Sequence, residues 1–290
     1  MNVVVVGGGA WGTAFSALLR GREHDVTLAV RATIDEAPYE DAELVAIAVP
    51  SRSFREALGH VRGTAPVLSL VKGLDPESGE RLSTLVRDRP VAVLSGPNMA
   101  EEVLAGLPGA TVIASEDESL ALWLQDAINS LAFRVYVNTD LIGVEICGAA
   151  KNVIGLSAGG VDGLGLGDNA KAALITRGLV EMARLGEALG AEPETFSGLA
   201  GMGDLIVTCW HPSGRNRRAG ELIARGATPE EAKTEIGQVV EGLTTAPVLR
   251  DLSRRIGVEL PITEGVCAVL DGMPLDELLA SLMGRRPTGE

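Results

Sequence analysis

The sequence has few cysteines and few aromatic residues (3%). Its three cysteines, Cys147, Cys209 and Cys267, are widely spaced and form no Cys-x-x-Cys pair. This argues against a disulfide framework or a zinc site, suggests no metal, and suits a reducing, cytoplasmic location. We expect no leader before the first strand. We also expect no apolar run long enough to cross a bilayer, and hence no integral membrane segment.

Positive charge is also scarce. The formal net charge is −14, which disfavours a nucleic acid or an anionic membrane as partner. An anionic ligand must therefore be held by local basic groups. Because arginine supplies most of the positive charge, lysine is expected where arginine cannot replace it. Only four of the 25 basic residues are lysines, namely Lys72, Lys151, Lys171 and Lys233.

The environment of Lys151 is unusual for a lysine. It lies in the apolar, small-residue stretch Glu145 to Leu156, which predicts a buried helix, so its ammonium group must be paired, neutralised or used. Burial lowers the pKa of a lysine and can make it a proton-transfer group near neutral pH. The alternative is a lysine whose stem packs on apolar surface while its head group reaches water.

The beginning of the chain has the pattern of a dinucleotide-binding fold. The β-branched run Val3 to Val6 predicts a buried parallel strand, and Gly7, Gly9 and Gly12 follow it before a predicted helix. These glycines permit a tight turn, approach of the backbone to pyrophosphate, and close helix packing. The helix N-terminus offers free N–H groups to phosphates. The alternative is an ordinary glycine-rich turn.

Arg31 follows the second predicted strand, Val26 to Val30. An NAD-specific site usually has Asp or Glu at this position, whereas arginine accommodates a ribose 2′-phosphate. We therefore expect NADPH to be accepted, unless Arg31 is only a surface residue.

Strands alternate with helical stretches as far as residue 139 and helices dominate afterwards. We therefore predict an α/β protein. Residues 1–139 would form a Rossmann-type, doubly wound parallel sheet that binds a dinucleotide, and residues 140–290 an all-α domain for substrate and catalysis. Lys72 and the segment Gly96 to Asn98 directly follow predicted strands, at the sheet edge where ligands bind.

The second half of the chain is predicted to consist mainly of helices. Helices are expected at Asp140 to Ser157 and Asn169 to Leu189, joined by a loop at Gly159 to Gly167, with Glu181 facing solvent. Further helices are expected as far as Met283.

Ser213 to Arg218 holds three arginines in an acidic protein, a concentration that suits a phosphate. The alternative is a basic surface loop that caps a helix.

Together these stretches resemble NAD(P)-dependent glycerol-3-phosphate dehydrogenase of the bacterial type. The matches follow the order of the family and span nearly the whole chain. They are the segments Gly7–Ala14, Val71–Gly73, Ser95–Pro97, Glu145–Asn152, Asp162–Gly178, Gly198–Leu205, Gly214–Arg217 and Val240–Gly242.

The resemblance implies reversible oxidation of sn-glycerol 3-phosphate to dihydroxyacetone phosphate with NADP or NAD, supplying glycerol 3-phosphate for phospholipid synthesis. It also makes a homodimer plausible. It implies that Lys151 accepts or donates the proton, with Asn152 and Asp204 orienting it and the substrate. It places substrate contacts at Lys72, Gly96, Asn98, Lys151, Asp204, Thr208, Gly214, Arg215 and Asn216. It places cofactor contacts at Gly7, Gly9, Ala10, Trp11, Gly12, Arg31, Lys72, Ala100, Arg215, Val239 and Glu241.

The chain departs from the family pattern after Arg31. Family members usually carry a helix-containing segment there that helps to cover the adenosine half of the cofactor, so its absence bears on cofactor affinity and preference.

Two other functions remain open. One is a related hydroxyacid dehydrogenase, whose substrate carboxylate would replace the phosphate, although the arginine cluster favours phosphate. The other is a non-catalytic dinucleotide sensor, which the joint presence of Lys72, Lys151, Asp204 and Arg215 disfavours.

Overall fold

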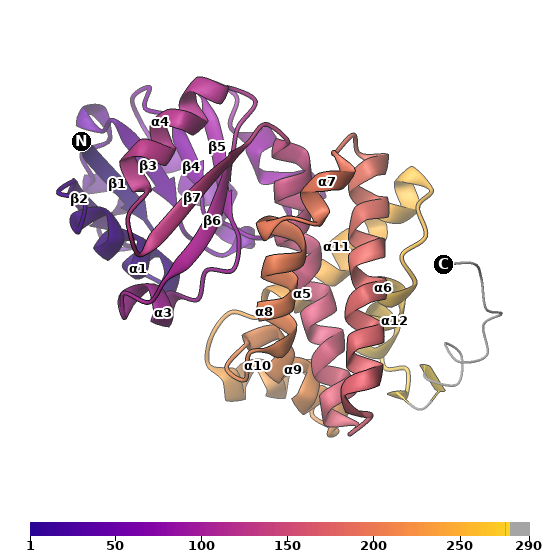
Figure 1. Ribbon diagram of the computed structural model, residues 1–290. Coiled ribbons are helices and arrows are strands. Elements are labelled where there is room, and N and C mark those ends of the chain that lie inside the picture. The colour runs from indigo at the N-terminus through magenta and orange to yellow at the C-terminus, as the bar shows by residue number, and fades with distance from the viewer. Residues whose placement is uncertain (276, 279–290) are drawn as a thin grey trace.

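The first half of the chain folds around one seven-stranded sheet (Figure 1). The computed structural model describes residues 1–275, 277 and 278, so the helix expected as far as Met283 lies partly outside them. The strand order is β2-β1-β3-β4-β5-β6-β7, and every neighbouring pair is parallel except β5 and β6. The strands are β1 (Asn2–Val6), β2 (Asp25–Ala29), β3 (Leu44–Ile47), β4 (Val67–Ser69), β5 (Val91–Ser95), β6 (Gly109–Ala114) and β7 (Phe133–Asn138).

The antiparallel pair is a difference from the predicted all-parallel sheet. The connection between β5 and β6 contains only the five-residue helix α3 (Ala100–Leu104), and β6 returns beside β5 in the opposite direction. The Rossmann-type sheet followed by a helical C-terminal half is otherwise confirmed.

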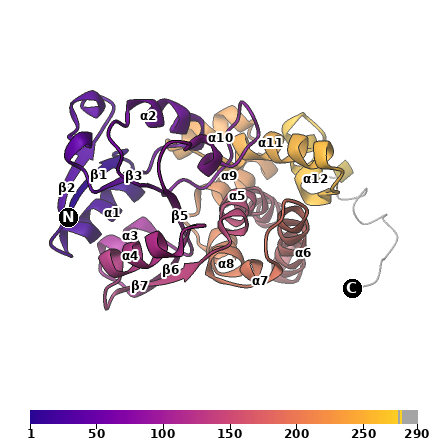
Figure 2. The same ribbon diagram turned by 90° about the horizontal axis from the view of Figure 1, so that it is seen from above.

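Alternating side chains of the strands supply two cores, one on each face of the sheet. Val3 and Val5 face a core shared with α1 (Ala10–Arg20) and α4 (Glu118–Ile128). Val4 and Val6 face the opposite core, which includes apolar residues of α2 (Phe54–His60). Figure 2 shows α2 on one side of the sheet and α1, α3 and α4 on the other.

The connection from β2 to β3 contains no α-helix, as the sequence predicted. Two short 3-10 turns, Ile34–Glu36 and Tyr39–Asp41, span it instead. Strand β2 lies at the edge of the sheet and pairs with β1 alone.

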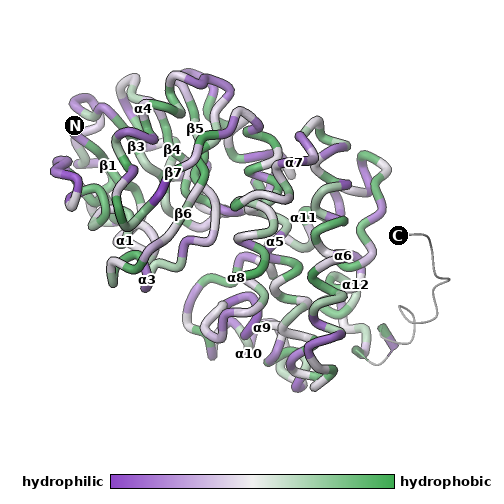
Figure 3. The backbone as a smooth tube through the Cα atoms, viewed as in Figure 1, coloured by the Kyte–Doolittle hydropathy of each residue, from purple (hydrophilic) through white to green (hydrophobic). Residues whose placement is uncertain are grey.

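The second half of the described chain is helical and packs around α5 (Leu141–Gly163), whose side chains supply much of its core. Figures 1 and 3 show α5 running through the middle of this half. The other helices are α6 (Gly167–Ala188), α7 (Pro193–Phe196), α8 (Asp204–Trp210), α9 (Arg215–Ala224), α10 (Pro229–Ile236), α11 (Glu241–Ile256) and α12 (Pro261–Leu270).

The predicted loop from Gly159 to Gly167 is wrong over its first half, because α5 continues to Gly163. Gly159 is needed for packing, whereas Gly165 and Gly167 have positive φ values and serve the turn between α5 and α6. A Cβ atom on Gly159 would lie 1.8 Å from the carbonyl oxygen of Arg217, and one on Gly220 would lie 1.8 Å from that of Leu156. Helices α5 and α9 thus touch backbone to backbone, which only glycine permits.

Helix α5 also corrects the expectation about apolar runs. It is long and apolar enough to cross a bilayer by length and composition. However, 89% of its most apolar window is buried inside the protein, so α5 is a core helix.

The expectation that Glu181 faces solvent is wrong, because its side chain is buried on α6. Its carboxylate accepts hydrogen bonds from the backbone N–H groups of Ile262 and Thr263, in the first turn of α12. Burial raises the pKa of Glu181 to about 7. This carboxylate therefore caps α12, a role with no local signature in the sequence.

Candidate active site

Two of the four lysines converge on one buried carboxylate. Lys72 lies just beyond β4, Lys151 lies in the middle of α5, and Asp204 begins α8 after a glycine-rich π-helical turn. The Nζ atom of Lys151 donates to Oδ1 of Asp204 at 2.6 Å, and that of Lys72 donates to Oδ2 at 2.6 Å. The side chains of Lys151 and Asp204 are only 8% and 3% exposed. The carboxylate therefore holds one cation on each oxygen.

Burial and ion pairing have opposite effects within this group. Burial lowers the pKa of Lys151 to about 8, although the charge of Asp204 opposes this shift. Burial alone would raise the pKa of Asp204, but the ammonium groups of Lys151 and Lys72 outweigh it and lower the pKa below its ordinary value. Lys151 can therefore gain or lose a proton near neutral pH while Asp204 stays ionised.

Each lysine has a second acceptor that fixes its direction. Lys151 donates to Oγ1 of Thr208, one turn after Asp204 on α8, at 2.8 Å. Lys72 donates to the carbonyl oxygen of Gly96 at 2.8 Å. Gly96 has a φ of +143°, a conformation that favours glycine.

Asn152 and Asn216 form a chain of amide hydrogen bonds behind the lysines. Asn152 donates to the backbone carbonyl of Lys72 at 2.9 Å and accepts from Nδ2 of Asn216 at 2.9 Å. Asn216 in turn accepts from the backbone N–H of Gly242 at 2.9 Å. Asn152 therefore braces the loop that carries Lys72, and this chain links α5 to the first turns of α9 and α11.

Arg215 and Gly214 lie at the start of α9. Nη1 of Arg215 donates to the carbonyl oxygen of Val239 at 3.0 Å, while much of its side chain remains exposed. Gly214 is the N-cap residue of α9. The guanidinium group therefore lies against the segment just before α11.

Glu241 joins the helical half to the sheet. Its carboxylate accepts from the backbone N–H of Ser51 at 3.1 Å and from its hydroxyl at 2.7 Å. Sequence reasoning missed Ser51 as a partner; its position just beyond a buried strand was the only signal available.

The glycine-rich turn after β1 fits a dinucleotide. Gly7 has a φ of +117°, and a Cβ atom there would lie 2.4 Å from the carbonyl oxygen of Ala48. A Cβ atom on Gly12 would lie 2.0 Å from the carbonyl oxygen of Gly7, so both glycines are required by packing. Gly9 instead faces open space, which leaves its backbone accessible to a pyrophosphate.

The neighbouring residues Ala10 and Trp11 begin α1. Ala10 is exposed, whereas the Trp11 ring packs near Phe15 and Phe133, with centroids 6.1 and 6.4 Å away.

The remaining predicted positions lie around the same sheet edge. The side chain of Arg31 is 89% exposed beyond β2, with Glu56 at 3.7 Å. Ala100 begins α3 and is half-buried. Asn98 donates to Thr111 at 2.9 Å, while its buried Oδ1 has no partner among the described residues and could accept from a ligand.

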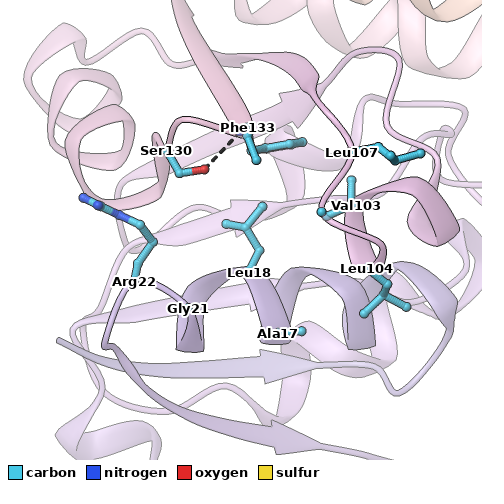
Figure 4. A pocket seen from close by; sticks show the side chains of 11 residues that line it. Ala17, Leu18, Gly21, Arg22, Val103, Leu104, Leu107, Ser130 and Phe133 are labelled. Atoms are coloured by element: carbon cyan, nitrogen blue, oxygen red, sulfur yellow. Dashed lines mark hydrogen bonds between the residues drawn. The ribbon is translucent and has the colours of Figure 1, made fainter.

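Lys171 and the pocket in Figure 4 lie outside this constellation. Lys171 pairs with Asp162 rather than with Asp204. The pocket, of about 230 Å³, is lined by residues of α1, α3 and the start of β7, including Leu18, Val103 and Phe133. None of the predicted site residues lines it.

Comparison with known proteins identifies relatives along most of the chain. The family model described as NAD-dependent glycerol-3-phosphate dehydrogenase C-terminus matches residues 140–280, and the corresponding N-terminus model matches residues 30–121. A protein named glycerol-3-phosphate dehydrogenase [NAD(P)+] from Symbiobacterium thermophilum is 48% identical, over 86% of this chain and 76% of its own. A protein of that name from Moorella thermoacetica is 41% identical over 100% and 97%.

Among solved structures, glycerol-3-phosphate dehydrogenase from Coxiella burnetii is similar, with a TM-score of 0.92 and 34% identity. The match covers 98% of this chain and 99% of the other. The comparison with the Moorella protein extends over 326 positions and includes all 290 residues of this chain. At 36 of these positions (326 minus 290) this chain therefore has no residue, in agreement with a shortened chain.

Proposed function

This chain belongs to the NAD-dependent glycerol-3-phosphate dehydrogenase family, and we propose that it oxidises sn-glycerol 3-phosphate reversibly to dihydroxyacetone phosphate with NAD or NADP. The observation that carries the proposal is the buried Asp204, which holds the ammonium groups of Lys72 and Lys151 at 2.6 Å each. In physiological terms we propose that the reduction supplies glycerol 3-phosphate for phospholipid synthesis.

The proposed chemistry requires the protein to move one proton. When bound, the nicotinamide supplies the hydride acceptor or donor. In oxidation, neutral Lys151 removes the proton of the substrate hydroxyl. In reduction, its ammonium form donates a proton to the oxygen that becomes the hydroxyl. Two ammonium groups around one carboxylate leave a local excess of positive charge, which favours a phosphorylated substrate and a developing alkoxide.

We assign the other contacts according to their positions. Gly7, Gly9 and Gly12 would hold the pyrophosphate together with the first turn of α1. The remaining cofactor contacts are proposed at Ala10, Trp11, Arg31, Lys72, Ala100, Arg215, Val239 and Glu241. Substrate contacts are proposed at Lys72, Gly96, Asn98, Lys151, Asp204, Thr208, Gly214, Arg215 and Asn216, with Asn152 bracing the loop of Lys72.

An assay with two reductants tests the function. Purified protein is mixed with dihydroxyacetone phosphate and either NADPH or NADH, and the loss of reduced-nicotinamide absorbance is followed. Turnover with at least one reductant supports the proposal. No absorbance loss with either would favour a non-catalytic sensor. Turnover of a hydroxyacid's keto form, but not of dihydroxyacetone phosphate, would favour a hydroxyacid dehydrogenase.

The pH dependence of this activity should follow Lys151. Because its pKa is lowered to about 8, kcat/KM for oxidation should rise with pH through about 8, as the neutral base forms. The kcat/KM for reduction should fall across the same pH range, because the ammonium form of Lys151, which donates the proton, is lost. Initial rates in both directions between about pH 6 and 10 measure this. Parallel profiles in the two directions would exclude Lys151 as the group responsible.

Arg215→Ala should raise the KM for dihydroxyacetone phosphate by about 10- to 100-fold, because a charge-assisted grip on the phosphate is lost. The side chain is exposed, so the fold should persist. Steady-state kinetics give the KM, with Arg225→Ala, just beyond the end of the same helix, as the matched control. An unchanged KM in Arg215→Ala would remove this residue from the phosphate site.

We further propose a cytoplasmic homodimer built from two domains, residues 1–139 for the dinucleotide and residues 140–290 for substrate and catalysis. The three cysteines are free and buried, as suits a reducing compartment. Light scattering after size-exclusion chromatography would distinguish a dimer from a monomer.

A further inference from the structure

A second ion cluster lies where α5, α6 and α9 meet, apart from the two lysines on Asp204. Oδ2 of Asp162 accepts from Nζ of Lys171 at 2.7 Å and from Nε of Arg217 at 2.5 Å. The side chains of Lys171 and Arg217 are only 5% and 17% exposed. A single carboxylate oxygen therefore ties three helices together.

The cluster also reaches the end of α8. Nζ of Lys171 lies 4.9 Å from the centroid of the Trp210 ring, within the range of a cation–π interaction. Trp210 immediately precedes the loop that leads to Arg215, and Arg217 follows that loop within the first turn of α9. Both ends of the loop are thus attached to the same group of charges.

The hydrogen bond between Arg217 and Asp162 keeps α9 in a fixed position on α5. Gly159 and Gly220 let the two backbones touch, but glycines carry no side chains that would lock one helix against sliding along the other. The hydrogen bond from Arg217 to Asp162 is short, charged and directional. Together with the hydrogen bond from Asn216 to Asn152, it therefore sets the position of the start of α9, and with it the position of Arg215.

We infer that Asp162, Lys171 and Arg217 are positioning residues that hold the start of α9 where Arg215 and Asn216 grip the substrate phosphate. This inference rests on the proposed function. Asp162 follows Lys151 by eleven residues (162 minus 151) on α5, which is about 16 Å along the helix. The cluster is therefore too remote to touch a three-carbon substrate at Lys151 and acts through α9.

The test is a comparison of kinetic constants in the full chain. Asp162→Asn and Arg217→Met should each raise the KM for dihydroxyacetone phosphate and the inhibition constant of inorganic phosphate by about 10- to 100-fold. Their kcat should stay within about threefold of the unaltered chain, because Lys151 and Asp204 are untouched. Their dissociation constant for NADPH should rise by less than the KM, and by no more than in Arg215→Ala, since Arg215 is also proposed as a cofactor contact. Arg217→Lys keeps a charge on α9 and should recover most of the loss.

Two control variants test whether the change in KM arises from the phosphate-binding residues at the start of α9. Lys233→Met, which removes an exposed lysine that pairs with Glu230 on α10, should leave every constant unchanged. In an Arg215→Ala background, Asp162→Asn should raise the KM by less than it does in the unaltered chain, because part of its effect passes through Arg215.

Three outcomes overturn the inference. An unchanged KM in both Asp162→Asn and Arg217→Met would do so. So would a loss of kcat as large as the KM change, which would indicate only a structural role; thermal unfolding of each variant shows whether the fold survives. If the unaltered chain itself fails to reduce dihydroxyacetone phosphate, the proposed function fails and this inference falls with it.

Discussion

Lys151→Met is expected to lower kcat by about 10²- to 10⁴-fold while leaving NADPH binding intact, because the variant lacks the group that accepts and donates the proton. Methionine has nearly the length of lysine and suits a buried helix. Asp204 keeps the hydrogen bond from Lys72, so the variant holds no unpaired carboxylate. Fluorescence titration with NADPH and initial rates with dihydroxyacetone phosphate measure the two properties separately.

A matched control for this variant is Lys233→Met. Lys233 is partly exposed on α10, where it pairs with Glu230 at the surface, so its removal should change neither property. Loss of NADPH binding together with turnover in Lys151→Met would mean that the lysine supports the fold rather than the chemistry. Turnover close to that of the unaltered chain would exclude it as the proton-transfer group.

Local signals in the sequence predicted most of the sheet. A β-branched run such as Val3 to Val6 is typical of a parallel strand buried on both faces, and Gly7, Gly9 and Gly12 mark a turn whose chemistry is local. The position of Lys72 directly after a strand placed it at the ligand-binding edge. The roles of these residues in binding stay predictions, whereas the fold class and the family are confirmed.

Contacts between distant segments could not be predicted in this way. Lys72 and Asp204 are 132 positions apart, and Ser51 and Glu241 are 190 positions apart. Only the folded chain brings such pairs together, because no local pattern specifies the partner. The resemblance to a family named Lys72, Lys151 and Asp204, but it did not state that both lysines share one carboxylate.

The predicted loop at Gly159 to Gly167 was partly wrong for a physical reason. In sequence, Gly159 and Gly160 indicate a break in a helix, since glycine weakens helices by about 1 kcal/mol relative to alanine. In the structure, contact with the backbone of Arg217 on α9 requires a glycine at position 159, and packing outweighs the local cost. For Glu181 the error was to expect exposure to solvent from its charge alone. The backbone N–H groups of α12 that bind its buried carboxylate have no local signature in the sequence.

Asp204→Asn should have the largest effect on stability. Asparagine keeps the size of the side chain but leaves the ammonium groups of Lys72 and Lys151 without their common counter-ion. Removing one partner of a buried ion pair costs about 3–5 kcal/mol, so the free energy of unfolding near neutral pH should fall by about that amount. Urea denaturation measures it, with Asp271→Asn, which only loses the exposed partner of Arg250, as the matched control.

The sign of the pH dependence in Asp204→Asn follows from the same charges. The charge of Asp204 raises the pKa of Lys151, so its loss should lower that pKa further below about 8. Between this folded-state pKa and the ordinary lysine value of 10.5, the unfolded chain binds more protons than the folded chain. The stability of the variant should therefore rise with pH over a wider range than that of the unaltered chain, and reduction should be lost at neutral pH because the acid form is missing.

Combining Asp204→Asn with Lys151→Met separates the cost of an unpaired charge from the cost of an altered shape. If the ammonium group of Lys151 causes the instability, the double variant should be more stable than Asp204→Asn alone, and its unfolding free energy should lose the added pH dependence. Additive losses in the two variants would instead mean that Asp204 stabilises α8 without reference to Lys151. Urea denaturation of the four proteins at about pH 7 and pH 9 decides between these outcomes, since the unpaired ammonium is disfavoured more strongly at the lower pH.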